Sequence, residues 1–397
     1  MSMASSVAGN RSLLRRMNSL ALLLELRRGP RTISHLTEAT GLSRTTAEAV
    51  LGDLVQLGWA ATAAPEERSG RPVMGRPAVS YRFAGEAGRL LSADIGAHHI
   101  HTVVADLQGT VLSSHTLAVS EQDPAADRLR STRSAMTAAL KEADTRAEDL
   151  WAVAIGSPGV ITDGGVRHFG GEGMPGWIGL DLAAAFAEDF DCPVLVEGDC
   201  ALGTVAEHRL GAARGARDVV YILCGNRTGA GIIANGDLYR GHRGGTGIIG
   251  ELPQLRWREL ELETYSGRPP ATGRPTRHEM FTAARQGDAE ALKAVSAFAE
   301  ALSVGIAAMI LAIDPELVVL GGGSSNSADL FVDLVRDNLH RLCPLMPAVA
   351  VSTLGGDAVA LGGIQIAWSH VDAALARAVE QGLAFPPATP EFVRDRG

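Results

Sequence analysis

The sequence is poor in cysteine and contains no long, uninterrupted apolar run. Its 397 residues include four cysteines, which are scattered and form no Cys-x-x-Cys pair. This spacing excludes a disulfide framework and a cysteine-rich zinc site, so no resident metal is expected. Arg, Gly, Pro or acidic residues interrupt each apolar segment, and we expect none to cross a bilayer. The first 29 residues carry arginines between their apolar positions, unlike a secretory signal, which favours a cytoplasmic location.

Lysine is absent from residues 1–84, yet this segment is basic. It carries 11 arginines against six acidic residues, a net charge of +5, whereas the remainder carries −14 of the chain's total of −9. A basic head on an acidic body indicates that only the head meets a polyanion. The length suits two or three domains. We expect a DNA-binding domain over 1–84 and a body over 85–397, with a second lobe covering roughly 200–370.

Apolar spacing in the head predicts three helices. The first covers about 11–28 and ends at Gly29-Pro30. The second begins after Thr32, a candidate N-cap, and stops at Gly41, where a left-handed turn suits glycine. Ser43 caps the third helix. Helix, glycine-containing turn and helix at this length is the helix-turn-helix plan. The apolar positions of the first helix are Leu13, Leu14, Met17, Leu20, Ala21 and Leu24.

The start of the third helix carries the candidate DNA-contacting residues. N-terminal residues of a recognition helix reach base edges in the major groove, where arginine can bind guanine through two hydrogen bonds. Hydroxyl groups contact phosphates or bases. The alternative is that Ser43 only caps and Arg44 is only solvated. A buried stripe of Ala47, Val50, Leu51 and Leu54 leaves the opposite face, with Ser43, Arg44, Thr45, Thr46 and Glu48, for DNA.

A polar hairpin from Trp59 to Phe83 follows the third helix. It contains Gly-Arg-Pro twice, centred on Arg71 and Arg76. An arginine at the tip of such a wing can enter a narrow, electronegative minor groove. The head is therefore expected to be a winged helix-turn-helix, with double-stranded DNA as its partner.

Beyond residue 89 strands and helices alternate, which predicts an α/β fold in two lobes. The expected strands cover 90–95, 99–105, 151–155, 194–197, 219–223 and 317–320, and the expected helices 125–146, 180–190, 201–210 and 289–313.

The order of these elements and their loops resembles the ROK family, whose sugar-kinase members share a two-lobed actin-like ATPase fold. The resemblance covers nearly the whole chain and implies that fold for the body. Its anchors are Asp94-Ile95-Gly96, Gly156-Ser157-Pro158-Gly159, Val196-Glu197-Gly198-Asp199 and the segment 314–323.

Both loops that bind phosphate in the family's kinases depart from the family pattern. Ala97-His98-His99 stands where a glycine and a threonine are expected after Asp94-Ile95-Gly96. In the second loop Arg227 is added where backbone amides should approach a phosphate. A solvated Arg227 is the favoured interpretation, and pairing with an anion is the alternative.

The sugar site departs from the family in the same way. Gly173 replaces the asparagine, Ile248 the glutamate and Glu251 the histidine expected there, and the cysteine-rich zinc loop is missing. Asp199 matches the kinase base and Glu263 a remaining sugar contact. The lost hydrogen bonds would each cost about 1–3 kcal/mol. Asp199, Glu251 and Glu263 could instead form an acidic site for a cationic or amino-bearing effector.

These features favour a DNA-binding transcriptional regulator, a repressor, that is not an enzyme and needs no cofactor. It would bind an inverted-repeat operator as a homodimer or homotetramer, because helix-turn-helix dimers read two half-sites. The body would serve dimerisation and would sense a small-molecule effector, a sugar or a derivative, without contact with a membrane. Two alternatives remain open: an active sugar kinase with a DNA-binding head, and a body that binds a protein partner.

Overall fold

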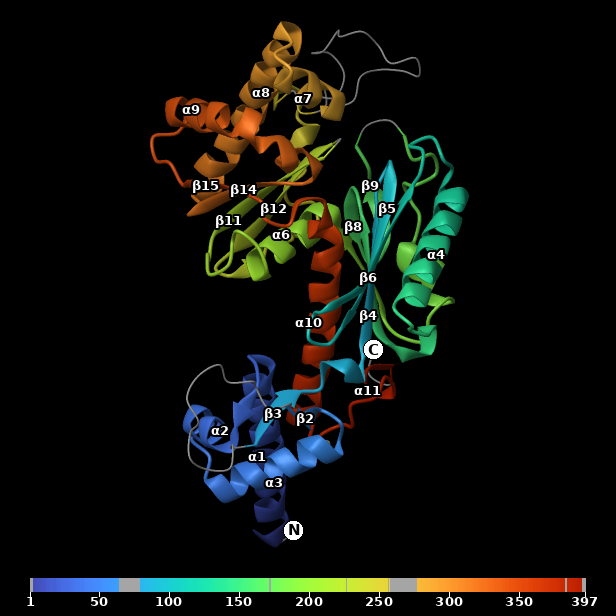
Figure 1. Ribbon diagram of the computed structural model, residues 1–397, viewed down its shortest axis with the longest axis vertical. Helices are drawn as coiled ribbons and strands as arrows, with labels where there is room; N and C mark the ends of the chain where they lie inside the picture. Colours follow the sequence, from blue (N-terminus) through green and yellow to red (C-terminus); the bar gives the residue numbers. More distant parts are fainter. Residues whose placement is uncertain are drawn as a thin grey trace, which may run out of the picture.

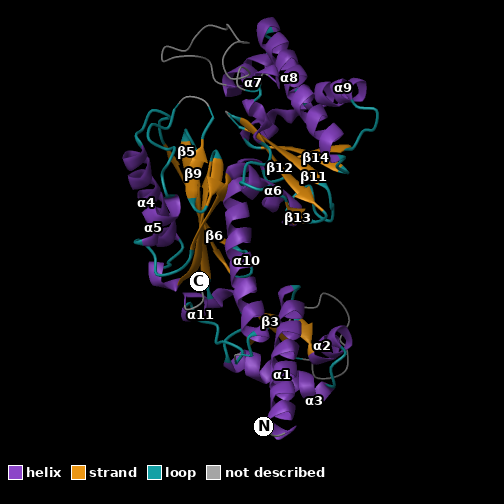
Figure 2. Ribbon diagram, turned by 180° about the vertical axis from the view of Figure 1, so that it is seen from behind, coloured by secondary structure: helices purple, strands orange, loops and turns teal. Residues whose placement is uncertain are grey.

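A computed structural model shows a small head joined to a two-lobed α/β body (Figure 1). The structure describes residues 3–63, 79–170, 173–225, 227–255, 257, 277–382 and 384–394, with side chains from Ser12 onward except at position 392. The expected fold class, a winged helix-turn-helix followed by an actin-like body, is confirmed. Figure 2 shows the long helix α10, Ala358–Glu380, running from the two lobes down to the head.

The head contains the three predicted helices, of which the second and third are capped as predicted, whereas the first begins at Met3 and not near residue 11. They are α1 (Met3–Arg27), α2 (Ile33–Thr40) and α3 (Arg44–Gln56). The Thr32 hydroxyl accepts a hydrogen bond from the backbone amide of His35 at 3.3 Å. Gly41 ends α2 with φ of +71°, a conformation that glycine adopts without strain. Ser43 caps α3 by accepting from the amide of Thr46 at 3.2 Å.

The buried face of α1 differs from the prediction. Leu14, Met17 and Leu24 are 58%, 52% and 46% exposed, so the expected apolar stripe largely faces solvent. The prediction was wrong because α1 meets α3, β3 and α10 with another side. That side is set by tertiary packing on both the head and the body, which helical spacing alone does not show. Its buried residues are Arg16, Ser19, Leu22, Leu23 and Leu26.

A three-stranded antiparallel sheet completes the head. Its order is β1 (Arg31–Thr32), β3 (Ser80–Phe83) and β2 (Ala60–Thr62). Ala60 pairs with Phe83 and Thr62 with Tyr81, so the two long strands form the hairpin expected from Trp59 to Phe83. The connection from residue 64 to residue 78, which holds Arg71 and Arg76, lies outside the described residues.

The first lobe is a five-stranded sheet between helices. Thr102 donates to the carbonyl of Ala135 in α4 at 3.3 Å, whereas Ser92 faces Gly363 in α10, so the two helices cover opposite faces. α4 ends at Glu142, four residues earlier than predicted, and Asp144 follows with φ of +47°. The strand order is β10 (Val194–Gly198), β7 (Leu150–Ser157), β4 (Arg89–Ile95), β5 (His99–Asp106) and β6 (Val111–Ala118); α4 is Ala125–Glu142, α5 is Leu182–Ala187, and a hairpin joins β8 (Val160–Thr162) to β9 (Gly165–His168).

The second lobe repeats this plan with its own sheet. Phe281, Phe298 and Phe331 pack ring against ring in its core, with centroids 5.2–5.8 Å apart. The strand order is β13 (Asp237–Leu238), β12 (Thr228–Ala234), β11 (Val219–Cys224), β14 (Leu317–Gly321) and β15 (Ala348–Val351); its helices are α6 (Asp199–Arg209), α7 (Arg277–Arg285), α8 (Ala289–Ile313) and α9 (Val332–Leu342).

Helix α8 corrects the expectation that no apolar segment is long enough to span a bilayer. Among the described residues, this 25-residue helix alone is long and apolar enough, with a mean hydropathy of 2.0 over its most apolar 18-residue window. The helix packs against α7, α9 and β11, and 56% of that apolar window is buried. Its hydropathy is therefore that of a core helix inside a folded lobe.

Candidate nucleic-acid interface and body site

The first turn of α3 presents the predicted DNA-contacting residues to solvent. Ser43, Arg44, Thr45 and Glu48 are exposed, whereas the opposite face is buried through Ala47, Val50, Leu51 and Leu54. Three of these residues, Ser43, Arg44 and Glu48, have partners within the helix. The hydroxyl groups of Ser43 and Thr46 lie 2.8 Å apart, and Arg44 pairs with Glu48. The exposed side of α3 can thus enter a groove without disturbing the head's core.

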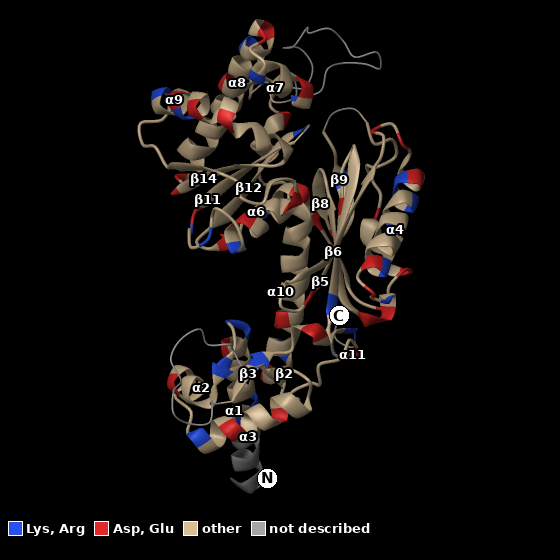
Figure 3. Ribbon diagram, viewed as in Figure 1, with Lys and Arg blue, Asp and Glu red and all other residues tan. Residues whose placement is uncertain are grey.

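Charge on the head is less uniform than its net value indicates. Figure 3 shows arginines on its helices and strands with acidic residues among them. Arg15 pairs with Asp53 at 2.5 Å, and Arg28 with Glu25 at 2.6 Å. Arg82, on β3, forms two hydrogen bonds to Glu86. Exposed pairs of this kind contribute little to stability, so they can be exchanged for phosphate contacts at low cost.

Asp199 begins α6 where the two lobes meet. Its carboxylate is half-buried and accepts from the backbone amide of Cys200 at 2.7 Å. Burial, reinforced by the nearby carboxylate of Asp94, raises the pKa of Asp199 to about 7. Asp94 also faces His99, whose Nε2 lies 3.7 Å from an Asp94 oxygen. The interaction with the Asp94 carboxylate raises the pKa of His99.

Arg227 packs against the first lobe, so the favoured interpretation of a solvated side chain was wrong. Its guanidinium lies 4.0 Å from the ring centroid of Phe169 and donates to the carbonyl of Gly170. A cation over an aromatic face is favourable, especially when partly desolvated. Sequence spacing could not show this contact, because Phe169 and Arg227 belong to different lobes.

The three proposed effector-binding carboxylates are not shown as one group. Glu251 lies 3.3 Å from Nε2 of His168, while Asp199 interacts with Asp94 and Arg227. Glu263 falls outside the described residues. The family's zinc does not fit the described residues, because Glu251 replaces a histidine and no group of three His, Cys, Asp or Glu is placed to hold a metal ion.

A contact at the start of α10 was not predicted. His101, on β5, is 5% exposed, and its Nδ1 lies 3.7 Å from an oxygen of Asp357. Its Nε2 lies 2.9 Å from the hydroxyl of Ser114 on β6. The alternation of His99 and His101 along one strand was the available signal, since both side chains point to the same face of the sheet.

Comparison with known proteins places both repressors and kinases among the relatives. The xylose repressor of Caldicellulosiruptor bescii is 22% identical and covers 91% of this chain and 98% of its own length. The DNA-binding transcriptional repressor Mlc of Escherichia coli is 26% identical, over 67% of this chain and 71% of Mlc. The glucokinase of Halalkalibacterium halodurans is also 26% identical, over 69% of this chain and 93% of the glucokinase.

Solved structures give the same fold. A ROK family transcriptional regulator, a homologue of the E. coli MLC protein, superimposes with a TM-score of 0.66 at 18% identity, over 96% of this chain and all of that one. A ROK family glucokinase from Streptomyces griseus gives 0.58 at 24% identity, over 70% of this chain and 99% of the glucokinase. The ROK family model matches residues 90–257 and 262–369. The chain therefore belongs to the ROK family.

Proposed function

We propose that this protein is a DNA-binding transcriptional repressor that acts from the cytoplasm. The observation that carries the proposal is the capped helix α3, whose exposed first turn holds Ser43, Arg44, Thr45 and Glu48 beside a winged sheet. The proposed interface also includes Thr46 on α3 and Arg71 and Arg76 on the wing. The coverage of the relatives supports it, since the xylose repressor matches 91% of the chain, which is more than residues 85–397 amount to, and the glucokinase matches 69%.

The proposed division of the chain follows from this function. Residues 1–84 bind DNA, and residues 85–397 form the body, whose second lobe covers roughly 200–370. The body serves as the dimerisation and effector-sensing part of a homodimer or homotetramer. Two heads related by a two-fold axis then read the two halves of an inverted repeat.

The effector is proposed to be a small molecule, a sugar or a derivative, bound near Asp199, Glu251 and Glu263. A buried carboxylate beside a second one, as in Asp199 and Asp94, favours a ligand that brings a hydrogen-bond donor or a positive charge. Catalysis is not proposed. Arg227 and His99 lie in the two loops that would have to hold phosphates, and their side chains contact Gly170 and Asp94 of the protein instead. An assay of sugar-dependent ATP turnover separates this view from an active kinase.

Footprinting on the protein's own promoter region tests the proposed function. We expect a two-fold symmetric protected site whose affinity falls steeply with salt, because basic residues displace counterions from the phosphates. The absence of any protected, salt-sensitive site would contradict it. A thermal-shift screen with sugars, sugar phosphates and nucleotides identifies the effector, since a ligand that binds the folded form alone raises its stability.

A further inference from the structure

Arg27, the last residue of α1, is buried against the body. Its guanidinium lies 4.2 Å from the ring centroid of Trp368 on α10 and 5.3 Å from that of Phe83 on β3. It forms an ion pair with Asp372, one turn further along α10, and its side chain is 12% exposed. Burial of an arginine is costly unless the charge is paired. At the end of α1, two aromatic rings and one carboxylate surround this cation.

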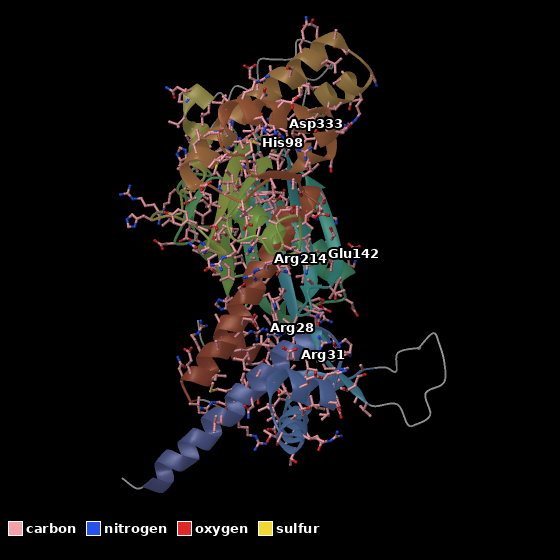
Figure 4. All side chains as sticks on the ribbon, turned by 90° about the vertical axis from the view of Figure 1, so that its left-hand side faces the viewer. Arg28, Arg31, His98, Glu142, Arg214 and Asp333 are labelled. Carbon is pink, nitrogen blue, oxygen red and sulfur yellow. The ribbon has the colours of Figure 1, made fainter. Side chains whose placement is uncertain are left out.

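The backbone of Arg27 is held as well. Its carbonyl accepts a hydrogen bond from the side chain of Gln108 at 3.1 Å, in the turn between β5 and β6 of the first lobe. The neighbouring Arg28 has a different environment. Its side chain is 70% exposed and pairs with Glu25 on its own helix. Figure 4 shows Arg28 where the head meets the body. Two adjacent arginines thus differ in whether they face the body or solvent.

The C-terminal segment 384–394 joins the head to the first lobe a second time. The indole nitrogen of Trp59 donates to the carbonyl of Pro386 at 2.7 Å, and the amide of Ala388 donates to the carbonyl of Leu57 at 2.8 Å. The other end of the segment includes α11, Glu391–Arg394. There Arg394 donates to the carbonyl of Glu148, just before β7, at 2.7 Å.

These contacts belong to one continuous hydrophobic core. Trp59 of the head meets Trp151 of β7 edge to face, with ring centroids 5.5 Å apart. The same cluster of buried residues includes Leu26 of α1 and Val371 of α10. A head on a free linker would make no such contacts. We define the head–body junction as Arg27, Trp59, Phe83, Trp368, Asp372 and the segment 384–394.

We propose that the head–body junction holds the DNA-binding head in a single orientation on α10, with Arg27 as its central contact. α10 begins where the two lobes meet, and there Asp357, just before its first residue, faces His101 (Figure 2). A rigid helix that starts between the lobes and contacts Arg27 roughly three to four turns later, through Trp368 and Asp372, transmits a change in the body to the head. A head released from the junction samples many orientations, and only a small fraction of them suits the operator. The apparent affinity for the operator falls in proportion to that fraction.

Hydrogen exchange of the full chain tests the junction without DNA or effector. The amide of Ala388 is the reporter, because it bonds to the head. In Arg27→Gln we expect it to exchange at least about ten-fold faster, while α8 of the second lobe keeps its protection. Arg28→Gln is the matched control and should leave both unchanged. Unaltered exchange of Ala388 in Arg27→Gln overturns the proposal.

A second variant serves if Arg27→Gln unfolds the chain, which loss of protection in α8 would reveal. Asp372→Asn keeps the aromatic contacts of Arg27 and removes the negative charge that pairs with it, a charge that also acts on Arg209 of α6. We expect faster exchange at Ala388, by a smaller factor, with α8 unaffected. Protection of Ala388 equal to that of the parent would then overturn the proposal.

Binding to a promoter fragment tests the consequence for DNA, which rests on the proposed function. We expect Arg27→Gln to bind the protected site about ten-fold more weakly and nonspecific DNA as the parent does. If Arg27→Gln binds the protected site as tightly as the parent does, although the amide of Ala388 exchanges faster, the junction does not control DNA binding. If the parent binds no specific DNA while Arg27→Gln still releases Ala388, the proposed function fails and the junction stands.

Discussion

Arg44 and Glu48 form an ion pair across one turn of the recognition helix, with Nε of Arg44 2.9 Å from a Glu48 oxygen. Both side chains are largely exposed, at 69% and 50%, so the pair adds little stability. Its geometry matters more than its energy. Glu48 holds the guanidinium along α3, where it can face the edge of a base, and a carboxylate in this position repels phosphate.

This pair leads to a prediction about base preference. Arg44→Ala should relax preference at one base pair in each half-site, at a cost of about 1–3 kcal/mol if the contact is bidentate. Glu48→Gln should strengthen binding to all sequences, because a negative charge facing the phosphates is removed. Selection from randomised half-sites measures both. Arg15→Ala, on α1, is the control, and preference retained by Arg44→Ala would remove this residue from base recognition.

The wing arginines should act through the shape of the minor groove. Arg76→Ala is expected to weaken binding mainly at operators with A/T-rich flanks, where the groove is narrow and electronegative. The measurement compares affinity for A/T-rich and G/C-rich flanks. Arg82→Ala, on β3 and paired with Glu86, is the control. Parental affinity of Arg76→Ala on both flanks would exclude the wing from recognition.

Replacing Asp199 should make stability depend on pH in a defined direction. Its pKa of about 7 in the folded chain exceeds the ordinary 3.8, so the folded state holds a proton that the unfolded state has lost. The parent therefore loses stability relative to Asp199→Asn as pH rises from 4 to 7. At pH 8 we expect the variant to be more stable by roughly 2 kcal/mol, about half of the full shift because the carboxylate is partly hydrated.

Urea unfolding across pH 5 to 8.5 measures this difference, with Asp237→Asn, an exposed carboxylate, as the control. DNA binding by Asp199→Asn should remain near that of the parent. A stability difference that stays constant with pH would contradict the protonated carboxylate. ATP turnover that depends on sugar and disappears in Asp199→Asn would instead restore the kinase interpretation.

Two tryptophans offer a matched comparison of the head–body junction with a lobe core. Trp59→Phe and Trp257→Phe each lose one indole hydrogen bond, to Pro386 and to Ala301 respectively. Each should cost about 1–2 kcal/mol of unfolding free energy. Limited proteolysis should cleave 384–394 faster in Trp59→Phe alone. Equal cleavage in both variants would show that the indole of Trp59 does not hold the segment.

Local signals in the sequence predicted the head's helix ends well. Thr32, Gly41 and Ser43 act through backbone groups within three or four residues, so the sequence contains the whole interaction. The buried stripe of α3 followed for the same reason. The contacts of the DNA-binding residues with DNA, and of the effector residues with a ligand, stay predictions.

Features that depend on distant packing were not predicted. The apolar residues of α1 occupy more than one side of the helix, and its packing on α3, β3 and α10 decides that Leu22 and Leu26 are buried while Met17 is not. The contact of Arg227 with Phe169, which lies in the other lobe, is a second example. The contacts of α10 and of the C-terminal segment with the head were not predicted, because these partners lie more than 300 residues earlier in the chain.

The bond between Trp59 and Pro386 has a consequence for synthesis on the ribosome. The partner of the indole is 327 residues downstream, and chains grow at about 5–20 residues per second. The head of a nascent chain therefore exists for on the order of a minute or less before its last supports emerge. During that interval Trp59 and Leu26 lack the partners that bury them, and a prematurely terminated product would keep them exposed. Chaperone binding to such truncated chains should exceed that to the finished protein.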